Sequence, residues 1–245
     1  MKQLLILMLI FTCNSGFSQK KSFLDFQIGG VRSISQSDFV ESNVASLNSG
    51  KIMPSVSVLF SSKILNPNVY LTTGLNLSYR NVQIQQNIDT LSYFGIIYAQ
   101  PKYRVISVPV LLNFQKKIDL NFSPVFEKIR TMGISTGFSI DFVKEVLIKN
   151  GMTIGGKGFN IRTSYKNNFA FKSNTGVSFN CSLSLPLLKF KNNQNLNLVG
   201  VYKYPFYTQN NLKLNYVING DSKDFEIKKL RLQEISIGLS FCTAR

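Results

Sequence analysis

Apolar and small polar residues alternate along much of this chain. The alternation is clearest in residues 69–82, where one face carries Leu71, Leu75, Leu77 and Tyr79 and the other carries Thr72, Gly74, Asn76 and Ser78. Successive side chains of a β-strand point to opposite faces, so the pattern predicts strands with one apolar face. Eight segments of this kind are expected as strands: 23–32, 52–62, 69–82, 105–115, 129–142, 174–188, 195–207 and 230–243.

The polar positions of these segments indicate what each face meets. They carry mostly Ser, Thr, Asn and Gly, whereas a surface facing water is typically rich in Lys and Glu. Small polar side chains suit the crowded interior of a narrow barrel, and the apolar positions then face lipid. Backbone groups inside a membrane must be paired, so the sheet has to close. The expected fold is an all-β, antiparallel transmembrane β-barrel with eight strands.

Nine apolar side chains on three of these strands are expected to face lipid. They are Leu71, Leu75, Leu77, Val108, Val110, Leu112, Ile235, Ile237 and Leu239.

The connections between the expected strands support a barrel of the outer-membrane type. Long and short connections alternate, as they do where long external loops alternate with short periplasmic turns. The external connections are expected at 33–51, 83–104, 143–173 and 208–229, with both termini in the periplasm. A ten-stranded barrel that uses residues 160–171 as an extra hairpin is the architectural alternative.

The N-terminus has the features of a secretory signal peptide. Lys2 precedes an apolar stretch at residues 4–11, and small or polar residues follow it. We expect cleavage before Gln19, which leaves residues 1–18 as the signal peptide and 19–245 as the barrel domain. Lipidation at Cys13 is the alternative, although Phe11 and Thr12 are poor residues for a lipidation site.

Two cysteines, at 181 and 242, remain in the mature chain, and we expect both to be free.

Composition narrows the possible partners. Charged residues make up 16% of the chain, below the roughly 25% usual in soluble domains. The 28 Lys and Arg residues against 12 Asp and Glu residues give a net charge of +16. Export argues against a nucleic-acid partner, and the basic residues lie in several connections instead of one stripe. Outer-membrane lipid and lipopolysaccharide phosphates are the expected partners; a general bias towards basic residues is the alternative.

One strand resembles a known family. The segment Tyr103-Arg-Val-Ile-Ser-Val-Pro-Val-Leu-Leu-Asn-Phe114 is similar to a strand of the PorT-like outer-membrane β-barrel family of Bacteroidetes, in which a proline lies within a barrel strand. The segment Ile235 to Phe241 resembles the closing strand of that family. The resemblance implies an outer-membrane barrel and, less directly, a partner in an envelope or secretion machine. Its matching residues are Tyr103, Val108, Pro109, Val110, Leu111 and Leu112.

The chemistry available to the chain argues against catalysis. No histidine occurs in the sequence, so a nucleophilic serine would lack its usual base, and we expect no catalytic residue, cofactor or metal site. Three charged residues are expected to face the barrel interior: Lys203 and Glu234 as an ion pair, with Asp25 nearer the periplasm. Buried charges require partners, so we expect a structural plug, with a gating or transport role as the alternative.

These features predict a non-enzymatic outer-membrane barrel that presents external loops or serves an envelope or secretion machine. A small channel or ligand carrier is a second possibility, and a soluble periplasmic β-protein is a third.

Overall fold

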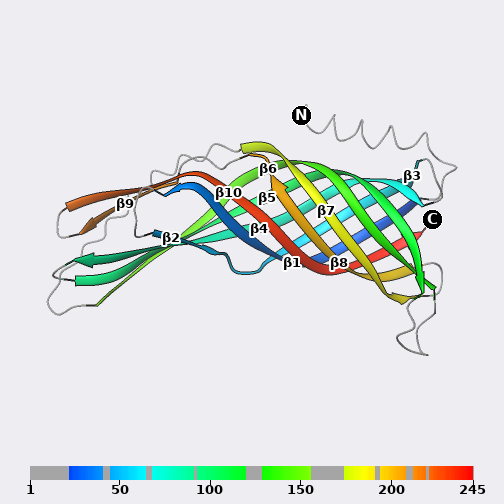
Figure 1. Cartoon of the computed structure of the whole chain (residues 1–245), viewed down its shortest axis with the longest axis horizontal. Coiled ribbons are helices and arrows are strands. Elements are labelled where there is room, and N and C mark those ends of the chain that lie inside the picture. The colour runs from blue at the N-terminus through cyan, green and yellow to red at the C-terminus, as the bar shows by residue number, and fades with distance from the viewer. Residues whose placement is uncertain are drawn as a thin grey trace.

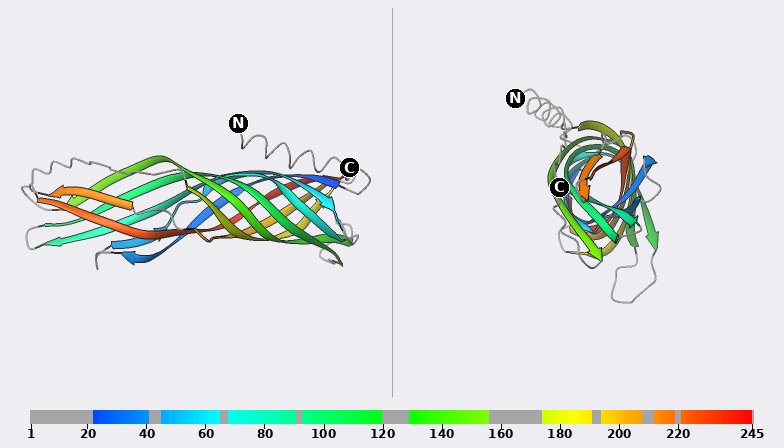
Figure 2. Two further views of the ribbon diagram at one scale, coloured as in Figure 1. Left: turned by 90° about the horizontal axis from the view of Figure 1, so that it is seen from above. Right: turned by 90° about the vertical axis from the view of Figure 1, so that its left-hand side faces the viewer.

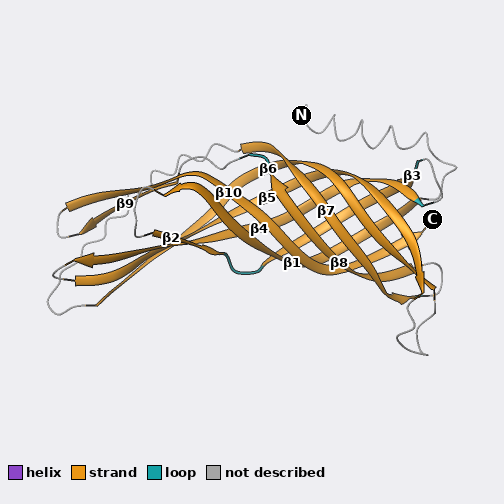
Figure 3. Cartoon of the chain, in the orientation of Figure 1, coloured by secondary structure: helices purple, strands orange, loops and turns teal. Residues whose placement is uncertain are grey.

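The part of the chain that the computed structural model describes is built of β-strands (Figures 1 and 3). It describes residues 22–40, 45–64, 68–90, 93–119, 129–155, 174–190, 194–207, 212–218 and 221–244. The strands are β1 (Ser22–Val40), β2 (Ala45–Ser49), β3 (Met53–Lys63), β4 (Val69–Thr90), β5 (Tyr93–Asp119), β6 (Ile129–Gly155), β7 (Asn174–Lys189), β8 (Gln194–Pro205), β9 (Leu212–Ile218) and β10 (Asp221–Ala244). The expected signal peptide and Cys13 lie outside the described residues. In the described part of the chain, no helix has the length and apolarity needed to cross a membrane.

Eight of these strands form a closed antiparallel barrel. The order around the wall is β1, β3, β4, β5, β6, β7, β8 and β10, and the pairing of β1 with β10 closes the sheet. The view along the long axis shows the resulting tube (Figure 2, right). Strands β6 and β7 pair directly, with Gly133 opposite Ser184. The eight-stranded prediction is therefore confirmed; residues 160–171, which the ten-stranded alternative used, lie outside the described residues.

Strands extend far beyond the segments in which apolar and polar residues alternate. The expected connection 83–104 is mostly a hairpin, because β4 and β5 pair as far as Thr90 and Tyr93. Likewise, β6 continues to Gly155, β2 pairs with the outer part of β4, and β9 pairs with the outer part of β10. These extensions project from the barrel at one end (Figure 1). The sequence pattern missed them because pairing of backbone groups between strands does not require an apolar face.

Both ends of the described chain lie at the opposite end of the barrel from the extensions. Phe23, near the start of β1, is the register partner of Ala244, the last residue of β10. We call this the terminal end and the other the extended end.

The two faces of the wall differ sharply. The described buried polar residues include many Ser, Thr and Asn side chains, whereas large apolar side chains are exposed on the outside. Of the nine residues expected to face lipid, seven have exposed fractions between 38% and 63%: Leu75, Leu77, Val110, Leu112, Ile235, Ile237 and Leu239. Leu71 and Val108 lie on the same outer face and are partly exposed.

The strand that resembles the PorT-like family alternates in the same way. Tyr103, Pro109 and Leu111 are buried inside the barrel, whereas Val108, Val110 and Leu112 point outwards. Proline has no backbone N–H, and the β4–β5 register has no partner for Val108 or Pro109. A proline therefore fits within this strand at the point where the ladder to β4 is interrupted.

Two glycines allow neighbouring strands to approach closely. Gly74 of β4 and Gly137 of β6 have positive φ angles of 156° and 159°. A Cβ atom at either position would collide with a backbone carbonyl oxygen, that of Val58 or Val110 respectively. The close approach of these strands requires glycine at both sites.

Candidate functional site in the barrel interior

Four charged side chains meet inside the barrel, about halfway along β4, β6 and β10 and near the end of β8. Arg80 of β4 forms ion pairs with Glu234 of β10 and with Asp141 of β6, the latter at 3.7 Å. Lys203 of β8 places its Nζ 2.6 Å from Asp141 Oδ1. All four side chains are nearly or fully buried. Two positive and two negative charges leave the group, which we call the charge cluster, electrically neutral.

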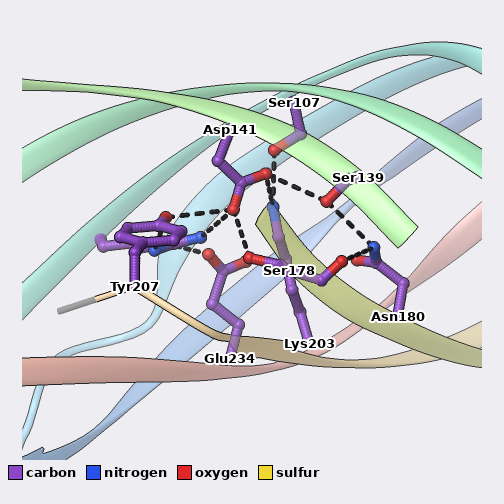
Figure 4. A network of polar contacts seen from close by, with 9 residues as sticks. Ser107, Ser139, Asp141, Ser178, Asn180, Lys203, Tyr207 and Glu234 are labelled. Carbon is purple, nitrogen blue, oxygen red and sulfur yellow. Dashed lines mark hydrogen bonds and ion pairs between the residues drawn. The ribbon is translucent and has the colours of Figure 1, made fainter. Parts of the chain in front are cut away.

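Neutral side chains complete the hydrogen bonding around Asp141 (Figure 4). Ser139 and Ser178 donate hydrogen bonds to its carboxylate over 3.0 Å and 2.5 Å, and the Tyr207 hydroxyl donates over 3.0 Å. The same tyrosine oxygen accepts from Arg80 Nη1 at 3.1 Å. Burying a carboxylate is costly unless it is paired and hydrogen-bonded, and Asp141 meets both requirements.

Lys203 is held by a second partner and links the cluster to β5. Its ammonium group donates to Ser107 Oγ over 2.6 Å, in addition to its contact with Asp141. Asn180 of β7 donates to Ser139 over 2.9 Å, so the network continues along the wall. The polar group therefore joins strands β4 to β8 and β10 across the interior.

The structure corrects the expected ion pair between Lys203 and Glu234. Their backbones are register partners on β8 and β10, as neighbouring strands require. Their ion pairs, however, are with Asp141 and Arg80 respectively. The wall of a narrow barrel curves, so inward-facing side chains can reach strands that do not adjoin their own. Sequence reasoning missed Arg80 and Asp141, although both occupy inward positions of expected strands.

Asp25 lies apart from the charge cluster, near the terminal end. It accepts hydrogen bonds from Ser240 at 2.5 Å and from Gln27 at 2.8 Å. No ion pair joins it to Lys203 or to Glu234. The expectation that Asp25 lies nearer the end that carries the termini agrees with this position, but it does not belong to the ionic plug.

An apolar layer lies directly beyond the charge cluster, towards the extended end. On four strands the next inward residue after a member of the polar network is a buried aliphatic one. These residues are Val82 after Arg80, Val105 after Ser107, Val143 after Asp141 and Leu232 after Glu234. Their exposed fractions are all 4% or less. Four buried aliphatic side chains therefore lie in the inward rows next to the charge cluster.

A polar cavity lies on the other side of the cluster. Its volume is about 400 Å³, and it reaches Ser22 and Cys242 at the terminal end. Hydroxyl and amide side chains dominate its lining, with Asp25 as the carboxylate and Asn180 adjoining the charge cluster. The barrel interior is thus hollow towards its terminal end, and beyond this cavity lie the buried side chains of the charge cluster and of the apolar layer.

The described residues contain no group of three or more His, Cys, Asp or Glu side chains arranged to hold a metal. Within the same residues, Cys181 and Cys242 are free. Cys181 is exposed on the outer face, whereas Cys242 borders the cavity.

Comparison with known proteins finds likenesses of structure only. No family model matches the chain, and no curated protein sequence matches it. Neisserial surface protein A is 11% identical with a TM-score of 0.35, and the alignment covers 89% of this chain and 95% of that one. The outer membrane protease OmpT of Escherichia coli is 7% identical, with a TM-score of 0.35 and coverages of 93% and 98%. The attachment protein Ail of Yersinia pestis, solved with a heparin analogue, is 7% identical, with a TM-score of 0.27 and coverages of 91% and 98%. Likenesses at this level carry no argument about function.

Proposed function

We propose that this protein is a non-enzymatic β-barrel of the bacterial outer membrane whose working part is its extended end. In this proposal the signal peptide directs export, the apolar outer face lies in lipid and the termini face the periplasm. The extended strands and the connections between them then project outwards. They present a surface to an envelope component or serve as an accessory to a secretion machine, as the resemblance to the PorT-like family implies.

The closure of the barrel interior is the observation that carries this proposal. The charge cluster and the apolar layer of Val82, Val105, Val143 and Leu232 fill the interior in succession. A barrel closed in this way has no continuous aqueous path for a solute. Much of the described chain, by contrast, forms strands outside the expected membrane segments.

The outer face supports a membrane location. Large apolar side chains are exposed on every one of the eight wall strands, including Phe26, Val56, Leu75, Val110, Phe138, Val177, Leu198 and Ile237. An exposed apolar surface that surrounds a closed barrel is costly in water and favourable in hydrocarbon. The absence of histidine from the sequence supports a non-enzymatic role.

Two measurements test the proposal together. The full chain, with its signal peptide, expressed in a bacterium with an outer membrane should fractionate with that membrane and migrate differently on gels before and after boiling. The same protein in planar lipid bilayers should show no steady conductance above the bare bilayer. Recovery in the soluble fraction, with identical migration of boiled and unboiled samples, would favour a soluble periplasmic protein instead.

A small ligand carrier is the second candidate, and the polar cavity is the observation that favours it. A volume of about 400 Å³ lies within the range of small-molecule sites. A carrier that releases its ligand across the membrane would have to open the charge cluster and the apolar layer. Uptake of radiolabelled small solutes into vesicles that contain the protein distinguishes the two candidates.

A further inference from the structure

A column of outward-facing residue pairs runs along strands β5 and β6. In order towards the extended end, the register partners are Phe114 with Ile134, Leu112 with Thr136, Val110 with Phe138, Val108 with Ile140 and Ile106 with Phe142. All of these side chains except Thr136 are apolar. From Phe114 to Ile106 the column extends about 27 Å along the strand, which agrees with the roughly 9–11 residues that a strand needs to cross a bilayer core.

The next outward pair beyond this column is Arg104 with Lys144. It lies about 7 Å further along the strands, at the depth of lipid headgroups if the column spans the hydrocarbon. Tyr79 of β4 is the register partner of Arg104 on the other side, and it also points outwards. Three side chains that can donate hydrogen bonds, two of them cationic, therefore form one row across three strands.

Two like charges opposite each other on neighbouring strands repel. Directly opposed residues place their Cβ atoms about 5 Å apart, and like charges there are destabilising. Three acidic residues have described side chains, Asp25, Asp141 and Glu234, and all three lie inside the barrel; the side chains of the other acidic residues, including Glu145 next to Lys144, lie outside the described part. The three described carboxylates have their partners in the interior and none of them pairs with Arg104 or Lys144. An external anion is the group that would complete this row.

The opposite border of the same column differs. There the next outward pair is Lys116 with Met132, a single cation. In this column the directly opposed pair of cations thus lies at the border towards the extended end, which in the proposed orientation is the end facing the outer leaflet.

From this arrangement we propose that Arg104, Lys144 and Tyr79 form a binding site for the phosphate group of a lipid in the outer leaflet. Arg104 and Lys144 donate charge-assisted hydrogen bonds to the phosphate oxygens, and Tyr79 donates through its hydroxyl. The site favours a lipid over free phosphate because it lies next to the apolar column. The acyl chains of a lipid bound there would lie along that column. The inference rests on the proposed membrane location.

The test is a titration of the detergent-solubilised barrel with lipid A, followed by native mass spectrometry. The probes are diphosphoryl lipid A, its dephosphorylated form and inorganic phosphate. Each cation near a phosphate-bearing surface contributes roughly fivefold in affinity. Arg104→Gln and Lys144→Gln should each weaken diphosphoryl lipid A binding about fivefold, and the double variant by about 25-fold. Lys116→Gln, the matched control on the same strand, should bind within about twofold of the wild type.

Several outcomes would overturn the site. The double variant could bind diphosphoryl lipid A as well as the wild type does, or Lys116→Gln could lose as much affinity as the site variants. Dephosphorylated lipid A could bind as tightly as diphosphoryl lipid A, or inorganic phosphate could displace the lipid at the same concentration. The conservative variant Arg104→Lys should retain most of the affinity. Insertion of each variant into phosphatidylcholine vesicles, followed by its heat-dependent gel migration, reports folding separately. Failure of the wild type to insert would refute the membrane location, whereas loss of phosphate selectivity in an inserted barrel would refute only this site.

Discussion

Lys203 and Glu234 lie opposite each other on adjacent strands, yet each forms its ion pair with a residue of a strand that does not adjoin its own. The four charges are neutral as a group and buried. Breaking a buried pair by removing one partner is strongly destabilising, because the other charge is left without compensation. The stability of the barrel therefore depends on the whole cluster more than on any one contact within it.

Removal of Arg80 tests this dependence. Arg80→Met leaves Glu234 without its ion-pair partner, and we expect the free energy of unfolding to fall by about 3–5 kcal/mol. The double variant Arg80→Met/Glu234→Met removes both charges and should recover much of the loss. Urea unfolding of the barrel in phosphatidylcholine vesicles measures both values. A double variant less stable than Arg80→Met would show that the pair is not a coupled unit.

The close contact between neighbouring strands at Gly74 and at Gly137 gives a second prediction. Gly74→Ala and Gly137→Ala each place a methyl group against a backbone carbonyl oxygen at a positive φ angle. We expect each to lower the free energy of unfolding by about 2 kcal/mol or more. Gly200→Ala is the control, since nothing lies within 4 Å of an added Cβ there. The same urea experiment compares the three, and equal stability of all three would contradict the close approach.

The sequence predicts a strand where its two faces have different surroundings, because apolar and polar residues then alternate. Eight wall segments alternate because one side of each faces the outside and the other a crowded interior. The extensions escaped prediction because Gln83, Gln85 and Gln86 of β4 interrupt the alternation while pairing continues. In those parts the strand is formed by backbone pairing with its neighbour, without an apolar face that the sequence could reveal.

The charge cluster was only partly predictable. Lys203 and Glu234 could be placed together from the sequence because they lie at corresponding positions of neighbouring expected strands. Arg80 and Asp141 are separated from their partners by intervening strands, so their contacts depend on the curvature and diameter of the closed barrel. A pattern within single strands reports which side of the wall a residue faces. It does not report which residues meet across the interior.

Cys181 gives a third prediction, which concerns the outer face. It is exposed, and its register partner on β6 is Thr136, near the middle of the apolar column. In a Cys242→Ser background, a charged maleimide should fail to modify Cys181 in intact lipid vesicles and should modify it after denaturation. Lys144→Cys in a cysteine-free background, placed at the headgroup border, should react without denaturation. Rapid modification of Cys181 in vesicles would place this face in water.

A final prediction distinguishes a gate from a plug. The charge cluster and the apolar layer close the interior in series, so removing one of them should leave the other intact. Glu234→Gln abolishes the carboxylate charge that pairs with Arg80, but Val82, Val105 and Leu232 still fill the next level, and planar bilayers should show no new conductance. Leu232→Gly alone should also remain closed, because the cluster persists. The double variant Glu234→Gln/Leu232→Gly weakens both layers and should conduct. Large conductance from Glu234→Gln alone would mean that the charge cluster is the gate of a channel. The apolar layer, whose residues are unchanged in this variant, would then not block the path.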